Sequence, residues 1–128
     1  MLKSVLVVDD DSSILRFMEH VLQNEGLDVT SVSNGVEALE LLKVQAFQLV
    51  ITDMRMPLVD GYDLVYTIKE LYPGVPILLT TAHPVNTRVE KALRFESVLF
   101  LRKPFTVEEV KRGVLALLPR FFDSQAAA

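Results

Sequence analysis

Apolar residues occur along this chain in two alternating patterns: short continuous runs, and longer stretches in which they recur every three or four positions. Residues 4–8, 49–51, 75–82 and 98–101 are mostly apolar runs, whereas residues 27–32 alternate apolar and polar side chains. Short apolar runs are typical of strands buried on both faces, and alternation is typical of a strand nearer the sheet edge. The pattern therefore predicts five strands.

One-sided helical spacing fills the intervals between these runs. We expect helices over about residues 12–25, 34–44, 62–71, 84–93 and 106–118. Ser12 or Ser13, Asn34 and Thr106 carry the short polar side chains that cap helix N-termini. Pro84 suits an early position in the fourth helix. That helix would turn four apolar residues inward, namely Val85, Val89, Ala92 and Leu93.

Strands that alternate with helices predict an α/β domain in which a doubly wound parallel sheet is covered on both faces through right-handed crossovers. A length of 128 residues and an apolar fraction of 50% suit one well-buried domain. We assign this domain to residues 1–118. Residues 119–128 lose the pattern and are expected to be a C-terminal tail, a linker stub or a cloning remnant.

Charge and composition exclude several classes of function. A net charge of −4 argues against binding of nucleic acid through a broad basic face. The absence of cysteine excludes disulfides, thiolate nucleophiles and cysteine-ligated metal centres. No apolar run approaches membrane-spanning length, and the N-terminal residues lack the pattern of a signal peptide. We therefore expect a soluble cytoplasmic protein that binds neither nucleic acid nor membrane directly.

Asp53 stands at the carboxyl end of the apolar run of residues 49–51, before a turn containing Pro57. Aspartate is rarely buried without a partner, so this position implies a cation, hydrogen-bond donors or chemistry. Taken alone, Asp53 would most simply cap the following loop. Its neighbours in the predicted sheet favour a functional role.

Polar residues converge at one edge of that sheet. In a five-stranded sheet with the order 2-1-3-4-5, the ligand crevice lies beyond the carboxyl ends of the first and third strands. Asp9 and Asp10 end the first strand and would lie beside Asp53. Thr81 ends the fourth strand and Lys103 follows the fifth. The predicted topology therefore gathers five polar residues around one crevice.

A cluster of carboxylates in a site of low dielectric needs a neutralising cation. Mg²⁺ fits because it favours a few carboxylates completed by waters, and Mn²⁺ would be able to replace it. Lys103 adds a compact positive charge and Thr81 adds a hydroxyl donor. These groups together suit a phosphoryl group that forms on, and is hydrolysed from, one carboxylate oxygen.

Four motifs resemble the receiver domain of bacterial two-component response regulators, the CheY-like family. They are VVDD at residues 7–10, the D-x-x-M-P-x-x-D-G pattern at residues 53–61, Thr81-Ala82, and Lys103-Pro104-Phe105. The resemblance covers residues 2 to about 118, and the motifs stand in order at the ends of the first, third, fourth and fifth predicted strands. The resemblance implies a flavodoxin-like (βα)5 receiver fold.

The resemblance also implies that Asp53 accepts a phosphoryl group from a phosphohistidine on a sensor histidine kinase or phosphotransfer protein. Asp10 would ligate Mg²⁺ directly, and Asp9 largely through water. Asp53 and the backbone carbonyl of Arg55 would complete the protein ligands. Such a domain assists its own phosphorylation and dephosphorylation, but it is a switch rather than a turnover enzyme.

Signal output is implied by the same resemblance. Thr81 would move to bond the phosphoryl group, Lys103 would pair with it, and Phe100 would reorient as an aromatic switch. A packing role is the alternative for Phe100. The fourth helix, fifth strand and fifth helix would present the signal to a downstream effector, to a fused output domain or to a second copy in a phosphorylation-dependent dimer.

Some positions depart from the family pattern or vary within it. Glu96 stands where receivers usually place a glycine, so the turn there is expected to differ. Asp11 is a third consecutive acid and is expected to be a solvated helix-entry residue. Arg55 and His83 match variable positions on the pocket rim. Pro104 is expected to follow a cis peptide bond.

The sequence disfavours two other functions. An Mg²⁺-dependent aspartyl-phosphate hydrolase would also use a strand-end aspartate, but such enzymes usually place an acid two residues later, where this chain has Arg55. A flavodoxin-type nucleotide-binding domain would need a glycine-rich phosphate loop after the first strand, where this chain has acids instead.

Overall fold

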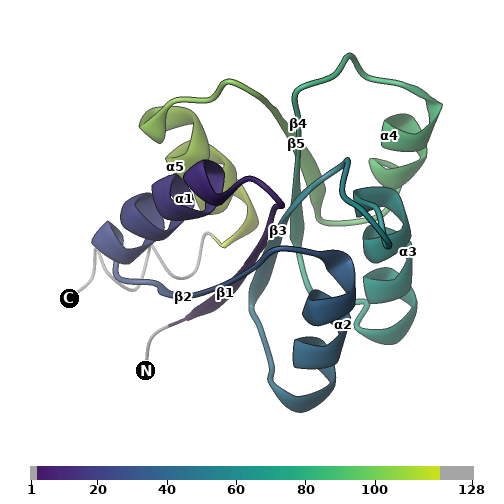
Figure 1. The fold of residues 1–128 in the computed structure, drawn as a ribbon, viewed down its shortest axis with the longest axis horizontal. Helices are drawn as coiled ribbons and strands as arrows, with labels where there is room; N and C mark the ends of the chain where they lie inside the picture. Colours follow the sequence, from purple (N-terminus) through teal and green to yellow (C-terminus); the bar gives the residue numbers. More distant parts are fainter. Residues whose placement is uncertain (1–2, 119–128) are drawn as a thin grey trace.

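Strands and helices alternate along the whole described chain, and the strands pair in the parallel order β2-β1-β3-β4-β5 (Figure 1). The computed structural model describes residues 3–118, so the predicted tail at residues 119–128 lies outside the described residues. The strands are β1 (Ser4–Val8), β2 (Asp28–Val32), β3 (Leu49–Asp53), β4 (Ile77–Thr81) and β5 (Val98–Arg102). The helices are α1 (Ser12–Asn24), α2 (Gly35–Val44), α3 (Gly61–Leu71), α4 (Thr87–Ala92) and α5 (Val107–Leu117). The predicted doubly wound, flavodoxin-like architecture is confirmed.

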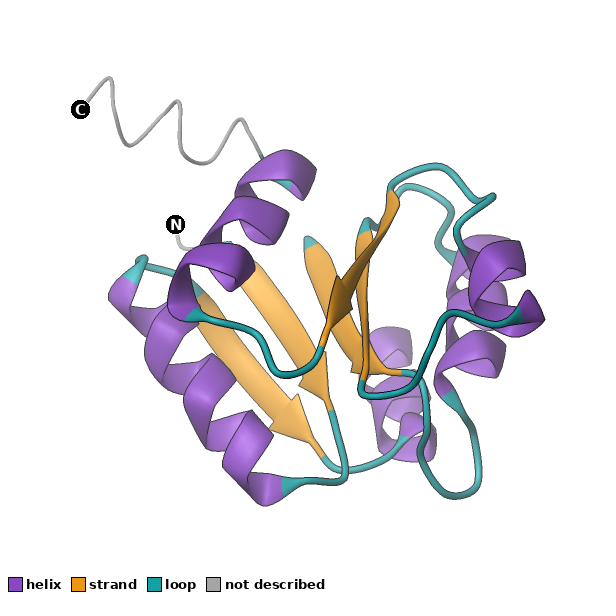
Figure 2. Cartoon of the chain, turned by 90° about the horizontal axis from the view of Figure 1, so that it is seen from above, coloured by secondary structure: helices purple, strands orange, loops and turns teal. Residues whose placement is uncertain are grey.

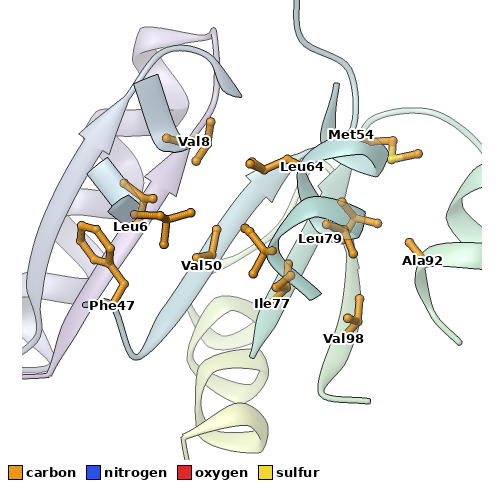
Figure 3. Packing of buried hydrophobic residues seen from close by; sticks show 14 of the residues in the cluster. Leu6, Val8, Phe47, Val50, Met54, Leu64, Ile77, Leu79, Ala92 and Val98 are labelled. Carbon is orange, nitrogen blue, oxygen red and sulfur yellow. The ribbon is translucent and has the colours of Figure 1, made fainter. Parts of the chain in front are cut away.

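The sheet separates two apolar layers. Successive side chains of a strand point to opposite faces, so Val5 and Val7 pack with α1 and α5, whereas Leu6 and Val8 pack on the face covered by α2, α3 and α4. Figure 3 shows part of the second layer, with residues of β1, β3, β4 and β5 meeting residues of the helices. All five residues of β3 and of β4 are buried, as expected for central strands.

Two helix starts differ from the prediction. Asp11, rather than Ser12 or Ser13, caps α1, and its carboxylate accepts a hydrogen bond of 2.9 Å from the Ser13 amide. Asn86 caps α4 by accepting from the Val89 amide at 3.0 Å, so Pro84 lies outside the helix. The predicted caps of α2 and α5, Asn34 and Thr106, are confirmed.

The extended segment before α4 also changes the predicted inward face. Val85 was expected to point inward, but it lies in this segment and is 47% exposed, whereas Val89 and Ala92 are buried. Beyond α4, Ser97 takes a left-handed backbone conformation with φ of 59°. The left-handed residue of the turn between α4 and β5 is therefore Ser97 and not Glu96.

Among residues 3–118, none of the helices combines the length and the apolar composition that crossing a membrane requires.

Gly61 allows the first turn of α3 to pack directly against the end of β3. Its amide donates to the Met54 carbonyl at 2.8 Å. A Cβ at this position would lie 2.3 Å from the Asp53 carbonyl oxygen and 2.6 Å from the Met54 Cα. Both neighbours are backbone atoms, so neither is able to rotate away.

Replacing Gly61 by alanine should therefore lower the free energy of unfolding by about 2 kcal/mol or more, because the added methyl group must displace backbone beside Asp53. Gly74→Ala is the matched control, since nothing lies within 4 Å of a Cβ built there. It should be neutral or stabilising by about 0.4–1 kcal/mol. Urea denaturation of the two variants checks this, and equal stabilities would contradict it.

Candidate functional site

The parallel sheet brings the candidate residues to one edge because its strands share one direction. Figure 2 shows the strand arrowheads leading into loops along that edge. Val8 of β1 is paired with Thr52 of β3, so Asp9 and Asp53 each follow directly after a residue of this pair. Asp53 is itself paired with Thr80 of β4, immediately before Thr81. The predicted convergence between β1, β3 and β4 is therefore present in the register.

Three carboxylates form the centre of the site. One oxygen each from Asp9, Asp10 and Asp53 lies within 4.8 Å of the other two. Asp9 is 1% exposed and Asp53 is 8% exposed, whereas Asp10 is exposed. Burial of two like charges so close together is unfavourable without positive charge nearby.

Lys103 supplies part of that positive charge. Its Nζ donates to Asp9 Oδ2 at 2.9 Å and lies 3.4 Å from Asp53 Oδ1. The Lys103 amide donates to the Thr81 carbonyl at 2.8 Å, which ties the backbone of the loop after β5 to the end of β4. The peptide bond between Lys103 and Pro104 is cis, as predicted.

Burial and charge shift the ionisation of this pair. Burial raises the pKa of Asp53, and the Asp9 charge raises it further, while Lys103 and the Met54 amide offset only part of the increase. Burial alone would lower the pKa of Lys103, but Asp9 and Asp53 outweigh it and the pKa is raised. Lys103 is therefore a cation at neutral pH.

The donor set suits a hard divalent cation. One ammonium group faces three carboxylates, so negative charge remains in excess. Asp9 Oδ1 also accepts a hydrogen bond of 2.9 Å from the Asp11 amide, which fixes the orientation of the Asp9 carboxylate. Oxygen ligands with net negative charge, one of them open to solvent, are what Mg²⁺ prefers.

Thr81 and the predicted rim residues surround this centre. Thr81 is 1% exposed, and its Oγ1 accepts a hydrogen bond of 3.1 Å from the His83 amide. The side chains of His83 and Arg55 are exposed. Phe100 does not join the carboxylates: it is partly buried and packs against the apolar layer under α2, α3 and α4.

Two contacts near the site were not predicted. The first is the amide of Asp11 on Asp9, which a run of three acids could have suggested, since such residues often accept from amides two positions along. The second is Arg88 of α4, whose Nη2 lies 2.8 Å from Asp60 Oδ2. The two residues are 28 positions apart, and no spacing rule connects them.

The known proteins that resemble this chain point to one family. The family model of the response regulator receiver domain matches residues 5–114. The DNA-binding transcriptional regulator NtrC of Escherichia coli (strain K12) is 38% identical over 121 residues, which cover 94% of this chain and 26% of NtrC. The response regulator protein FleR of Pseudomonas aeruginosa is 35% identical over 123 residues, covering 93% of this chain and 26% of FleR. The chain thus spans about a quarter of the length of these relatives.

Solved structures agree on the fold. Chemotaxis protein CheY4 of Vibrio cholerae has a TM-score of 0.85 at 28% identity, covering 92% of this chain and 100% of that chain. A CheY-like receiver domain protein of Methanospirillum hungatei JF-1 has a TM-score of 0.88 at 23% identity, covering 97% and 99%. The resemblance inferred from the four motifs is confirmed.

The raised pKa of Asp53 predicts how stability depends on pH when EDTA removes divalent cations. A carboxyl group whose pKa is higher in the folded state disfavours folding once it ionises, so its cost appears as the pH rises above about 3.8, the unfolded value, and is complete above the folded value. Asp53→Asn should therefore raise the free energy of unfolding at pH 7, and the gain should shrink toward pH 4.

Urea denaturation across this pH range measures the effect. Asp28→Asn is the control, because Asp28 is an exposed carboxylate at the start of β2, at the other end of the sheet. It should not reproduce the pH-dependent gain. An Asp53→Asn protein less stable than wild type at pH 7 would mean that the pairing with Lys103 outweighs burial.

Proposed function

Because this chain belongs to the family of response regulator receiver domains, we propose that it is a phosphorylation switch in which Asp53 accepts a phosphoryl group from a phosphohistidine of a sensor histidine kinase or phosphotransfer protein. The observation that carries this proposal is the meeting of Asp9, Asp10, Asp53 and Lys103 at one edge of the sheet. Receiver domains act in signalling rather than as turnover enzymes. We assign the receiver to residues 1–118.

The chemistry of transfer follows from the two oxygens of Asp53. The Met54 amide and Lys103 both contact Oδ1, so we assign bond formation to Oδ2. Oδ2 attacks phosphorus, the P–N bond to the donor imidazole breaks, and its electron pair stays on the imidazole nitrogen. Lys103 then lies where it can pair with a phosphoryl oxygen. Hydrolysis by water reverses the modification, releasing phosphate and restoring the carboxylate.

Asp9, Asp10, Asp53 and the backbone carbonyl of Arg55 are the residues we propose to hold Mg²⁺, with Mn²⁺ as a substitute. The three carboxylates fit this cation because their oxygens already converge within 4.8 Å. Bound Mg²⁺ would neutralise the carboxylates and stabilise negative charge on the phosphoryl oxygens. The carboxylate of Asp9, fixed by Lys103 and the Asp11 amide, keeps this arrangement in place.

For output, we propose that Thr81 moves toward the phosphoryl group and that Phe100 reorients with it. In support, the Thr81 hydroxyl is bonded to the His83 amide, at the start of an exposed segment. The signal would leave through α4, β5 and α5, to a downstream effector, a fused output domain or a second copy of the chain. NtrC is a DNA-binding regulator, but the net charge of −4 argues against DNA binding by these residues themselves.

The hydrolase alternative is disfavoured by one position. Arg55 stands two residues after Asp53, where such an enzyme usually places its general acid, and its side chain is exposed. Release of phosphate from a small phosphate ester with many turnovers per protein would reopen this alternative.

A small phosphodonor such as acetyl phosphate, supplied with Mg²⁺, should add one phosphoryl group to each protein molecule. Asp53→Asn and excess EDTA should each abolish the modification, because they remove the nucleophile and the cation. Intact-protein mass spectrometry measures this, and Asp28→Asn, which alters an exposed carboxylate away from the site, should be modified like wild type. A folded wild-type protein that is never modified would refute the assignment.

The consecutive acids allow a sharp test of the proposed cation ligands. Asp10→Asn should weaken Mg²⁺ binding by at least about tenfold, because it removes a ligand oxygen. Asp11→Asn should change the affinity little, since asparagine caps a helix as well as aspartate does. Isothermal titration calorimetry with Mg²⁺ compares them. Equal loss in both variants would mean that general negative charge, rather than a defined ligand, holds the cation.

A further inference from the structure

Arg88 joins the first turn of α4 to the first turn of α3. Its Nη2 lies 2.8 Å from Asp60 Oδ2, 3.0 Å from Asp60 Oδ1 and 3.4 Å from Asp63 Oδ1. Its guanidinium carbon lies 4.7 Å from the centre of the Tyr62 ring. One side chain thus makes both an ion pair and a cation–π contact with the same helix start.

α4 is a short helix that is anchored in the core by one face. It has six residues, of which Val89 and Ala92 are buried in the apolar layer under α2, α3 and α4. The five residues that join it to β4, Ala82 to Asn86, are all exposed. Among the described elements α4 packs chiefly on α3, as Figure 1 also shows. The ion pair of Arg88 is therefore a side-chain contact that ties the exposed first turn of α4 to the start of α3.

Asp60, the partner of Arg88, lies at the end of the loop that follows Asp53. Asp60 caps α3 by accepting from the Asp63 amide at 2.9 Å, and the next residue, Gly61, packs against the backbone of Asp53. Asp60 and Arg88 also line a hollow with Arg55, the residue whose carbonyl we propose as a metal ligand. The ion pair thus joins the end of the loop after β3 to the first turn of α4, the helix that follows the loop after β4.

We propose that Arg88 is a positioning residue: by pairing with Asp60 it holds α4 in the arrangement in which Thr81 is bonded to the His83 amide, and so opposes phosphorylation. This inference rests on the proposed function, in which Thr81 moves toward a group on Asp53. Thr81 is joined to Arg88 through six residues, and the amide of one of them, His83, is bonded to its hydroxyl; in this proposal, movement of Thr81 therefore shifts the first turn of α4 as well. A contact made in only one of two arrangements shifts their equilibrium by its own free energy.

The test is the affinity for beryllofluoride, a phosphoryl analogue, measured with saturating Mg²⁺. Arg88→Gln should bind it about two- to fivefold more tightly than wild type, the range expected for a partly exposed ion pair. Asp60→Asn should have the same effect, because asparagine retains the cap of α3 while losing the charge. The double variant should add nothing to either single variant, because both remove the same contact.

Lys111→Gln is the matched control. Lys111 of α5 pairs with Glu25 at 3.0 Å at the end of α1, with exposure similar to that of the Arg88 pair. Its loss should leave the beryllofluoride affinity unchanged. Equal affinity of wild type and Arg88→Gln, or weaker binding by Arg88→Gln, would overturn the proposal.

Amide hydrogen exchange without any phosphoryl analogue separates the two hypotheses. Arg88→Gln should speed exchange of the α4 amides and leave those of α1 unchanged. A wild-type protein that does not bind beryllofluoride refutes the role of Asp53, but this comparison still decides whether Arg88 restrains α4. Unchanged exchange in α4 would overturn the role of Arg88 even if Asp53 is phosphorylated.

Discussion

Negative charge buried at the end of an apolar sheet is the constraint on which the rest of this structure depends. Asp9 and Asp53 are almost inaccessible to solvent, and Asp10 lies beside them. Lys103 balances only part of this charge, although it contacts both buried carboxylates. The electrostatics of the fold therefore leave this edge of the sheet with negative charge in excess, which a bound cation would neutralise.

The two-layer core makes this placement possible. Because the strands are parallel, their carboxyl ends lie at a common edge, and residues distant in sequence meet there without a long loop. Alternate residues of each strand pack in opposite apolar layers, so a slip by one residue would send each side chain to the other layer and disrupt the packing of both. The packing thus holds the register that brings Asp9 next to Asp53.

Hydrophobic patterning and motif spacing were sufficient to predict the sheet order, the edge where the polar residues meet and the caps at Asn34 and Thr106. These depend on local spacing and on topology, both of which the chain encodes directly. The predicted start of α4 was wrong. Pro84 and Asn86 both suit the start of a helix, and only the hydrogen bond from the Val89 amide to Asn86 decides between them. The pairing of Arg88 with Asp60 depends on tertiary packing, which no spacing rule reports.

The direction of α5 has a consequence for how such a domain communicates. The helix begins beside the loop that carries Lys103 and runs back for 11 residues, about 16 Å, toward the opposite edge of the sheet. Any polypeptide continuing from it would depart from the side remote from Asp53. A chemical change at Asp53 would then reach that side of the domain only through movement within the fold, because the end of α5 lies away from the edge that carries Asp53.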